Sequence, residues 1–483
     1  MVDVTVVGSG PNGLSAAVTA ARAGLSVRLL EAAPTLGGGI RTSELTLPGF
    51  RHDVCSAVHP AAMASPFFRE FGLTDRIEWI VPEVSYAHPL DDGRAGVAWR
   101  DLDRTADALG RDGRAWRHLF EPLLKRLPEI VDFTGSSLVR FPPHPLAALA
   151  YGLRVLEQGS PLWDIRFHEE IAPAMLTGVA AHAAGRQPSL ATAGAGLLLA
   201  MHGHAGGWGF PVGGSQAIAD VMVADLLAHG GTVETGVMVE SLAELEPSRV
   251  TLLDTSTKLL LDADLPSSYR RALQRYRYGS GVAKVDFALS GAVPWANADV
   301  RLAPTVHLGG TRAEIAASEN LVARGRVPSH PYVLVTQPTV LDASRAPAGQ
   351  HVLWAYIHVP KGSTLDATEL VTAQVEQFAP GFRDLILASA SSSAQELAAY
   401  NPNYVGGDIY SGALTLRQLV KRPVVSPQPW RTPLDGVYLC SSATPPGPAV
   451  HGMNGWYAAT LALREKFGIT APISLGAQGD PRA

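Results

Sequence analysis

The sequence predicts an α/β fold in which a Rossmann-like nucleotide-binding domain is interleaved with a second domain of mixed sheet and helices. Residues 4–13 combine a short apolar, β-branched run with a Gly-x-Gly-x-x-Gly turn, which is typical of the start of such a domain. Residues 211–242 and 436–456, far along the chain, also show strand-like and helix-like patterns. At 483 residues the chain exceeds one ordinary domain. We therefore expect the nucleotide-binding domain to be discontinuous.

The first glycine turn predicts a pyrophosphate site. Gly8 permits the tight turn, Gly10 lets the backbone approach the phosphates, and Gly13 lets the following helix, expected over residues 13–23, pack against the strand. Backbone amides at a helix N-terminus favour negative charge. We expect Gly8, Gly10, Pro11, Asn12 and Gly13 to bind the cofactor.

The next segment distinguishes between nucleotides. Residues 26–30 predict a second strand, closed by Glu31, and an acidic residue at that position accepts hydrogen bonds from an adenosine ribose. Residues 36–42 follow where an NAD domain would begin another helical crossover. They resemble the second glycine motif of the FAD-binding superfamily that includes amine oxidases and carotene desaturases. The resemblance implies FAD, with Gly37, Gly38, Gly39 and Arg41 backing its pyrophosphate and flavin.

Two later segments fit the same cofactor. Residues 211–215 open a predicted helix through Leu227, and a strand is expected over residues 237–242, where the superfamily holds the adenine by the residue matching Val239. Residues 436–443 predict a strand, followed by a loop and a helix from Trp456. This resembles the segment that cradles the isoalloxazine ring, which implies cofactor contacts from Ser442, Gly452 and Met453.

Composition narrows the class of protein. Hydrophobic residues are 46% and charged residues 17%, yet no apolar run of about 18 residues predicts a transmembrane helix. Met1 precedes the first strand too closely for a signal peptide, so we expect a cytoplasmic protein. A net charge of -5 gives no reason to expect nucleic acid. Cys55 and Cys440 are interpreted as reduced thiols, no metal-ligand spacing is evident, and the oligomeric state is not indicated.

The remaining segments predict the substrate domain. We expect the FAD-binding domain to comprise residues 1–75, 205–282 and 425–470, the substrate domain residues 76–204 and 283–424, and a C-terminal tail residues 471–483. Residues 76–204 have largely helical patterns, and the alanine-rich run 190–200 predicts a core helix rather than a membrane-dipping entrance. Alternation predicts strands at residues 283–289, 332–336 and 351–359.

Taken together, the motifs resemble those of phytoene dehydrogenase-related FAD-dependent oxidoreductases, in the bacterial group similar to pyridine nucleotide-disulfide oxidoreductase domain-containing protein 2. The resemblance covers nearly the whole chain and implies a glutathione reductase-like FAD domain. The residues that carry it are the N-terminal glycine turn, 37–42, 47–53, 305–311, 401–408 and 439–455.

Three residues are candidates for the chemistry. Lys284 resembles the amine oxidase lysine that holds a water at flavin N5, where its positive charge would assist oxygen reactivity, but it also fits a strand-end lysine that is exposed or ion-paired. Trp456 matches an aromatic residue that flanks the flavin in amine oxidases, or is a core aromatic. His451 is the histidine inside the predicted flavin loop. Cys55 or His59 would be the residue to tether flavin covalently, although no spacing requires it.

The resemblance implies an FAD-dependent dehydrogenase or desaturase that removes hydride from a carbon of an apolar, polyene- or polyketide-like substrate, with oxygen or a quinone as electron acceptor. A flavin amine oxidase, favoured by Lys284, and a redox-neutral isomerase are alternatives. Rab GDP-dissociation inhibitors share the fold as non-catalytic carriers, but the intact glycines with Glu31 and Arg41 argue against a carrier. Whether the protein contacts a membrane to collect its substrate stays open.

Overall fold

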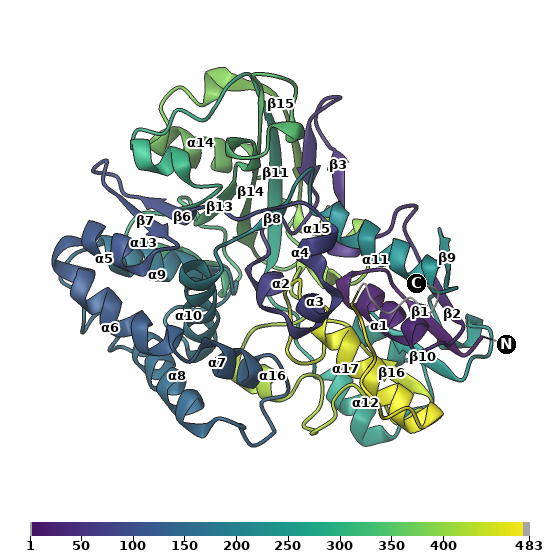
Figure 1. The fold of residues 1–483 in the computed structure, drawn as a ribbon. Helices are drawn as coiled ribbons and strands as arrows, with labels where there is room; N and C mark the ends of the chain where they lie inside the picture. The colour runs from purple at the N-terminus through teal and green to yellow at the C-terminus, as the bar shows by residue number, and fades with distance from the viewer. Residues whose placement is uncertain (1, 477–483) are drawn as a thin grey trace.

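The computed structural model describes residues 2–476 and contains two main sheets (Figure 1). The smaller sheet has five parallel strands in the order β16 (Val437–Leu439), β10 (Val250–Leu253), β1 (Val4–Val7), β2 (Val27–Glu31) and β9 (Thr232–Thr235). Its strands come from the beginning, the middle and the end of the chain. The predicted α/β class with a discontinuous Rossmann-like domain is therefore confirmed.

Three long helices cover this sheet: α1 (Pro11–Arg22), α11 (Gln216–Ala228) and α17 (Met453–Ala462). α1 begins two residues earlier than predicted, because Gly10 is its N-cap and Pro11 suits the first helical position. α17 begins at Met453, three residues before the predicted start at Trp456, directly after Gly452 turns the chain at φ +67°. Short helices α3 (Pro66–Phe71), α4 (Leu73–Arg76) and α12 (Ser267–Gln274) lie around them.

The larger sheet belongs to the second domain. Its seven strands run in the order β15 (Ile386–Ser392), β11 (Gly281–Leu289), β14 (His351–Val359), β13 (Val333–Thr336), β12 (Thr305–Leu308), β6 (Val84–Pro89) and β7 (Ala95–Trp99). All pairs are antiparallel except β12 with β6. α14 (Thr368–Phe378), α13 (Arg312–Val322) and α9 (Ile171–Ala181) pack against it (Figure 1).

One prediction about secondary structure is incomplete and one is wrong. Residues 76–204 are largely helical as predicted, but they also contain the strands β5 (Trp79–Ile80), β6 and β7; β6 is buried along its whole length, so it lacks the alternation that marks a half-buried strand. The strand expected over residues 237–242 is not formed. β9 ends at Thr235, Gly236 turns the chain at φ +74°, and residues 237–241 continue as a loop.

Most helices of the second domain form a layer on one side of the sheet: α5 (Leu102–Ala108), α6 (Gly113–Leu124), α7 (Leu127–Thr134), α8 (Pro145–Gln158), α9 and α10 (Leu190–Ala205). α10 contains the predicted core helix 190–200 and extends it by five residues, with Ser189 as its N-cap. Among residues 2–476, no helix is long and apolar enough to cross a membrane.

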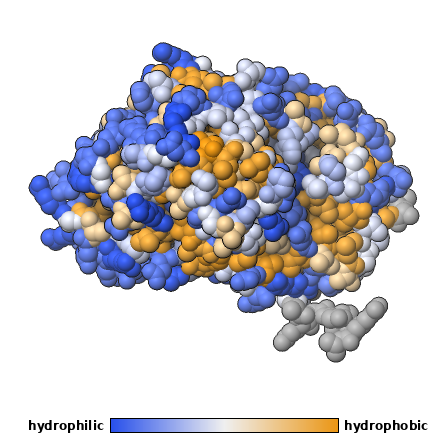
Figure 2. Space-filling model, turned by 90° about the horizontal axis from the view of Figure 1, so that it is seen from above, coloured by the Kyte–Doolittle hydropathy of each residue, from blue (hydrophilic) through white to orange (hydrophobic). Residues whose placement is uncertain are grey.

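Some large apolar side chains nevertheless face solvent. Leu146, Leu149, Leu153 and Leu156 follow helical spacing along one side of α8, and Phe141 before it is 84% exposed. Figure 2 shows a different view, in which apolar residues also gather across the middle of a face with hydrophilic margins. The protein therefore exposes more apolar surface than singly scattered residues would give.

The remaining elements connect the two domains. β3 (Thr42–Glu44) pairs with β4 (Arg51–Asp53), and β5 pairs with β8 (Phe210–Pro211). α2 (Pro60–Ala64), α15 (Ala394–Tyr400) and α16 (Leu416–Val420) complete the helices. The predicted domain boundaries stay predictions, and part of the predicted tail, residues 477–483, lies outside the described residues. Cys55 and Cys440 are both free thiols, as predicted.

Candidate functional site

One cavity of about 1150 Å³ extends from the glycine turn of the smaller sheet to the face of the larger sheet. We call the part around Gly8–Asn12, Glu31 and residues 237–240 the nucleotide end. We call the part bounded by His182, Thr336, Trp354, Tyr356 and Tyr410 the sheet end. Residues from both domains therefore enclose one continuous space.

Glycines shape the nucleotide end. Gly8 has φ +97°, and no side chain caps the N-terminus of α1 at Gly10. A Cβ atom on Gly38 would lie 2.9 Å from the Cα of Gly10, so the two predicted glycine motifs touch each other. Together they form a cradle of backbone that no larger residue would allow. The N-terminus of a helix beside such a cradle fits a pyrophosphate.

Glu31 and Arg41 form a buried ion pair with an N–O distance of 3.0 Å. The carboxylate of Glu31 accepts four hydrogen bonds, from the backbone of Ser9 and Ala33, the hydroxyl of Ser9, and Arg41. Arg41 also donates to the hydroxyl of Tyr400 and to a backbone carbonyl. A ribose hydroxyl would therefore have to share or replace one of the bonds to Glu31, because a carboxylate offers about four acceptor positions.

Most predicted cofactor residues line the cavity: Gly8, Gly10, Pro11, Asn12, Glu31, Gly38, Gly39, Arg41, Val239, Ser442 and Met453. Gly13, Gly37 and Gly452 do not line it. Gly13 lies within α1, where its amide faces Asp254, and the carbonyl of Gly452 accepts a hydrogen bond from Ser15. The structure thus brings together eleven of fourteen residues from five segments of the sequence.

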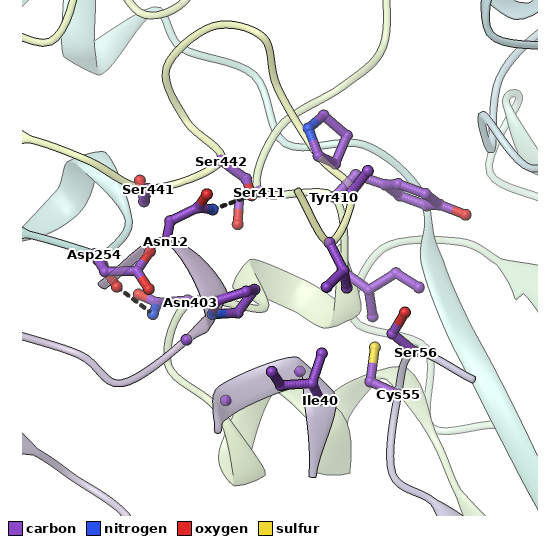
Figure 3. Close-up of a pocket in the computed structure, with 18 of the residues that line it drawn as sticks. Asn12, Ile40, Cys55, Ser56, Asp254, Asn403, Tyr410, Ser411, Ser441 and Ser442 are labelled. Atoms are coloured by element: carbon purple, nitrogen blue, oxygen red, sulfur yellow. Dashed lines mark hydrogen bonds between the residues drawn. The ribbon is translucent and has the colours of Figure 1, made fainter. Parts of the chain in front are cut away.

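Asp254 is a cavity residue that the sequence analysis missed. It follows β10 directly, and its carboxylate accepts a hydrogen bond of 2.9 Å from the amide of Gly13. Figure 3 shows it beside Asn12, Ser441 and Ser442, with Asn403 donating to its backbone carbonyl. Burial raises the pKa of Asp254 to about 7, and the nearby charge of Glu31 also raises it, although the amides of Gly13 and Gly10 oppose the shift. A single aspartate after a strand carries no motif that would have marked it.

The structure separates the three predicted catalytic residues. His451 lines the cavity, and its Nδ1 accepts a hydrogen bond from the amide of Met453. Burial lowers the pKa of His451 to about 4, so the ring is neutral at pH 7. Trp456 does not line the cavity; it packs against Phe67 and Tyr457, which matches the alternative of a core aromatic.

Lys284 also lies outside the cavity wall. It is 4% exposed in β11 and forms an ion pair with Asp286, so of the two sequence interpretations the structure contains the ion-paired lysine. The neighbouring Trp354 lines the cavity instead: its ring centre is 5.7 Å from Lys284 Nζ, and its strand position pairs with Asp286. Burial raises the pKa of Asp286 to about 6, while Lys284 opposes the shift.

The sheet end is aromatic and polar but carries no carboxylate. Tyr356 and Tyr410 place their hydroxyl oxygens 3.3 Å apart, and Trp354 packs edge-on against Tyr356. His182, at the end of α9, lies with its Nε2 2.8 Å from Nε2 of the buried His307. Burial lowers the pKa of His182 to about 3, which leaves a neutral imidazole. These side chains come from distant segments, so no local spacing predicts them.

The candidates for a covalent tether differ in position. Cys55 lines the cavity, and burial raises the pKa of its thiol, so it is protonated at pH 7. His59 does not line the cavity; its Nε2 is 2.8 Å from the hydroxyl of Ser215. Figure 3 shows Cys55 and Ser56 together near Ile40. Among residues 2–476, no group of three or more metal-ligating side chains is close enough to hold a metal.

Comparisons with known proteins agree with this architecture. A family model described as an NAD(P)-binding Rossmann-like domain matches residues 6–71. The chain is 25% identical to pyridine nucleotide-disulfide oxidoreductase domain-containing protein 2 of Rattus norvegicus, over 96% of this chain and 93% of that protein. It is 27% identical to phytoene dehydrogenase of Streptomyces griseus, over 80% and 77% of the two chains. Its fold resembles that of putrescine oxidase bound to putrescine, with a TM-score of 0.60 at 18% identity over 98% and 99% of the chains. The resemblance that the motifs predict is confirmed.

Proposed function

We propose that this protein, like the flavin-type oxidoreductases of the amine oxidase and phytoene dehydrogenase superfamily that it resembles, binds FAD and dehydrogenates a largely apolar, uncharged substrate. One observation carries the proposal: a single cavity joins a glycine cradle suited to a pyrophosphate with an enclosed aromatic end. When bound, FAD would supply the electron acceptor for a hydride from a substrate carbon.

The cavity walls fit this cofactor. The two glycine motifs and the start of α1 would hold the pyrophosphate, and Glu31 and Val239 would hold the adenosine. Ser442, His451 and Met453, around the start of α17, would lie against the flavin ring. Cys55, on the opposite wall, has a protonated thiol, which favours a non-covalent flavin because the thiolate is the reactive form.

The distribution of charge favours an uncharged substrate. The carboxylates that line the cavity, Glu31, Glu240, Asp254 and Asp262, all belong to the nucleotide end. No described acidic residue lines the sheet end, so a protonated amine would find no counter-ion there. A polyene or a polyketide-like molecule meets this environment without an unpaired buried charge.

We infer that His182, the histidine at the sheet end, accepts the proton that desaturation releases. Forming a C=C bond removes a hydride from one carbon and a proton from its neighbour. The imidazole of His182 is neutral, it lines the cavity, and its Nε2 is 2.8 Å from Nε2 of His307. Because burial lowers its pKa to about 3, the ring is a weak base in the free protein, and the bound substrate would have to favour the protonated ring for this transfer to occur while the chain excludes water.

A flavin amine oxidase is the second candidate. Trp354, Tyr356 and Tyr410 form an aromatic wall of the kind that holds cations and amines through their ring faces. The Nζ of Lys284 lies 5.7 Å from the ring centre of Trp354 in this wall. A redox-neutral isomerase would use the same cavity without net consumption of an acceptor, and a carrier would bind no FAD.

We further propose that the exposed side of α8 touches a membrane or lipid phase that stores the substrate and a quinone acceptor, with oxygen as the alternative acceptor. The four exposed leucines of α8 lie against solvent, and α8 packs on α7. Val131, Thr134 and Gly135 at the end of α7 line the cavity. An apolar surface beside an apolar cavity shortens the path of a lipid-like molecule from one to the other.

The first experiment is the visible spectrum of the purified protein before and after acid precipitation. Released flavin supports non-covalent FAD, flavin in the pellet means a tether, and no flavin favours the carrier. Flavin-loaded protein is then mixed anaerobically with apolar polyenes and with primary amines. Bleaching by polyenes supports the dehydrogenase, bleaching by amines alone supports the oxidase, and product without acceptor consumption supports the isomerase.

A further inference from the structure

The carboxylate of Asp254 lies beside the glycine turn that forms the cradle. A Cβ atom built on Gly10 would lie 2.5 Å from Asp254 Oδ2 and one on Gly13 would lie 3.0 Å from Asp254 Cβ. The same Oδ2 accepts the hydrogen bond from the amide of Gly13. Asp254 therefore lies against Gly10, whose missing side chain is expected to let the backbone approach a pyrophosphate, and against Gly13 in the first turn of α1.

The backbone fixes Asp254 in this position. Its amide donates to the carbonyl of Val7, 2.8 Å away, and its own carbonyl accepts from Asn403. The residue is 8% exposed and follows a central strand of the parallel sheet. The backbone of Asp254 is therefore held on both sides, and the hydrogen bond from the amide of Gly13 holds its carboxyl group beside the first turn of α1.

The charged groups around Asp254 do not neutralise it. Glu31, at the end of β2, adds negative charge, although Arg41 pairs with it. Cys440 of the neighbouring strand is a buried protonated thiol. Lys258 and Asp262 also line this end of the cavity but are exposed to solvent. No described cation forms an ion pair with Asp254, so a bound pyrophosphate would face an uncompensated carboxylate.

We propose that Asp254 must be protonated for the cradle to accept a pyrophosphate, so that binding of FAD takes up one proton at this residue. The neutral carboxylic acid donates its O–H to a phosphate oxygen instead of repelling it. This inference rests on the proposed FAD cofactor.

The affinity for FAD should fall as the pH rises above 7. In the free protein the pKa of Asp254 is about 7, and bound phosphates would raise it further. Below pH 7 the acid form dominates in both states, so affinity is constant. Above pH 7 the free protein loses the proton that the complex keeps, so affinity falls about tenfold for each pH unit.

The test is the dissociation constant of FAD for flavin-free protein, measured by quenching of flavin fluorescence between pH 6 and 9. We expect the wild type to bind about 100-fold more weakly at pH 9 than at pH 6. Asp254→Asn keeps the shape and an acceptor for Gly13, and should bind FAD equally at all pH values. Asp262→Asn removes a charge from the same end of the cavity and should retain the wild-type slope. Calorimetry at pH 8 in two buffers of different ionisation enthalpy should show uptake of about one proton by wild type and none by Asp254→Asn.

The same measurement with adenosine, which lacks phosphate, and with ADP, which carries the pyrophosphate, shows which part of FAD causes the pH dependence. Only the affinity for ADP should fall as the pH rises. Equal slopes for wild type and Asp254→Asn, or a slope lost in Asp262→Asn, would overturn the role of Asp254 while leaving FAD as cofactor. Absence of FAD binding at every pH in all three proteins would overturn the proposed cofactor and this inference with it. Thermal melting of Asp254→Asn confirms that the variant is folded.

Discussion

Replacing Lys284 with methionine separates a structural role from a catalytic one. Lys284 and Asp286 are 4% and 3% exposed, and their ion pair lies beside Trp354. His52 places its Nδ1 3.5 Å from Asp286, but burial and the charge of Lys284 lower the pKa of His52 to about 3, so it is neutral at pH 7. Lys284 is therefore the cation that compensates Asp286.

The size of the effect follows from this geometry. Removing one partner of a buried ion pair costs about 3–5 kcal/mol. The pKa of Asp286 is already raised to about 6, so without Lys284 the carboxyl group protonates near neutral pH, and we expect the lower part of that range. With about 2.1 cal/mol/K of unfolding entropy per residue, a 483-residue chain that melts as one unit changes by about 1 kcal/mol per degree. Lys284→Met should lower Tm by about 3 °C.

The matched variant removes both charges. Lys284→Met combined with Asp286→Leu leaves no unpaired charge, so its stability should return to within about 1 kcal/mol of wild type. Two quantities are measured for each variant: the Tm, and the rate at which oxygen reoxidises the reduced, flavin-loaded protein. An unchanged oxygen rate in the stable double variant assigns Lys284 a structural role, whereas a tenfold or larger loss restores the predicted role in oxygen reactivity. A wild-type Tm in Lys284→Met alone would refute the reasoning about the pair.

Three further predictions concern the base, the helix packing and the exposed surface. His182→Gln should keep its FAD spectrum but slow anaerobic flavin reduction by substrate by about 10²–10⁴-fold in stopped flow; an unchanged rate removes His182 as the base. Gly455→Ala should cost about 1–3 kcal/mol in thermal melting, because its Cβ would overlap the carbonyl of Asn12, while Gly152→Ala, with open space around it, should be neutral or stabilising. Leu149→Ser with Leu153→Ser should reduce co-sedimentation with phospholipid vesicles and leave Tm unchanged; equal sedimentation of wild type and variant counts against a membrane surface.

Local sequence determines much of the nucleotide end. The strand at residues 4–7, the glycine turn and α1 are consecutive, so their spacing alone defines a strand, a tight turn and a helix N-terminus. The loop from Gly38 to Arg41 follows within ten residues of Glu31, and the two motifs meet as predicted. Even Glu31 lines the cavity, although its bonds to Ser9 and Arg41 depend on packing that no pattern displays.

The sheet end could not be predicted in the same way. Whether a strand residue lines the cavity depends on its neighbours in the sheet: Lys284 and Trp354 occupy adjacent strands, and only the tryptophan lines the cavity. β6 was missed because burial on both faces removes the alternation of polar and apolar residues. His182, Tyr356 and Tyr410 come from three separate segments of the chain and line the same cavity only in the folded protein. No spacing in the sequence therefore predicts this part of the site.

The two ends of the cavity differ in the charge of the groups that they can accept, and this difference bears on both the cofactor and the substrate. At the nucleotide end Arg41 compensates Glu31, which leaves Asp254 as the buried acid that a pyrophosphate must meet. At the sheet end no described carboxylate lines the wall, and His182 is neutral. At the nucleotide end, backbone amides would stabilise an anionic group once Asp254 is protonated. At the sheet end, a cation would find no buried counter-ion. Under the proposed function, the cradle would bind the pyrophosphate dianion of FAD while the sheet end would accept an uncharged molecule, and this difference favours a C–H dehydrogenation over the oxidation of a charged amine.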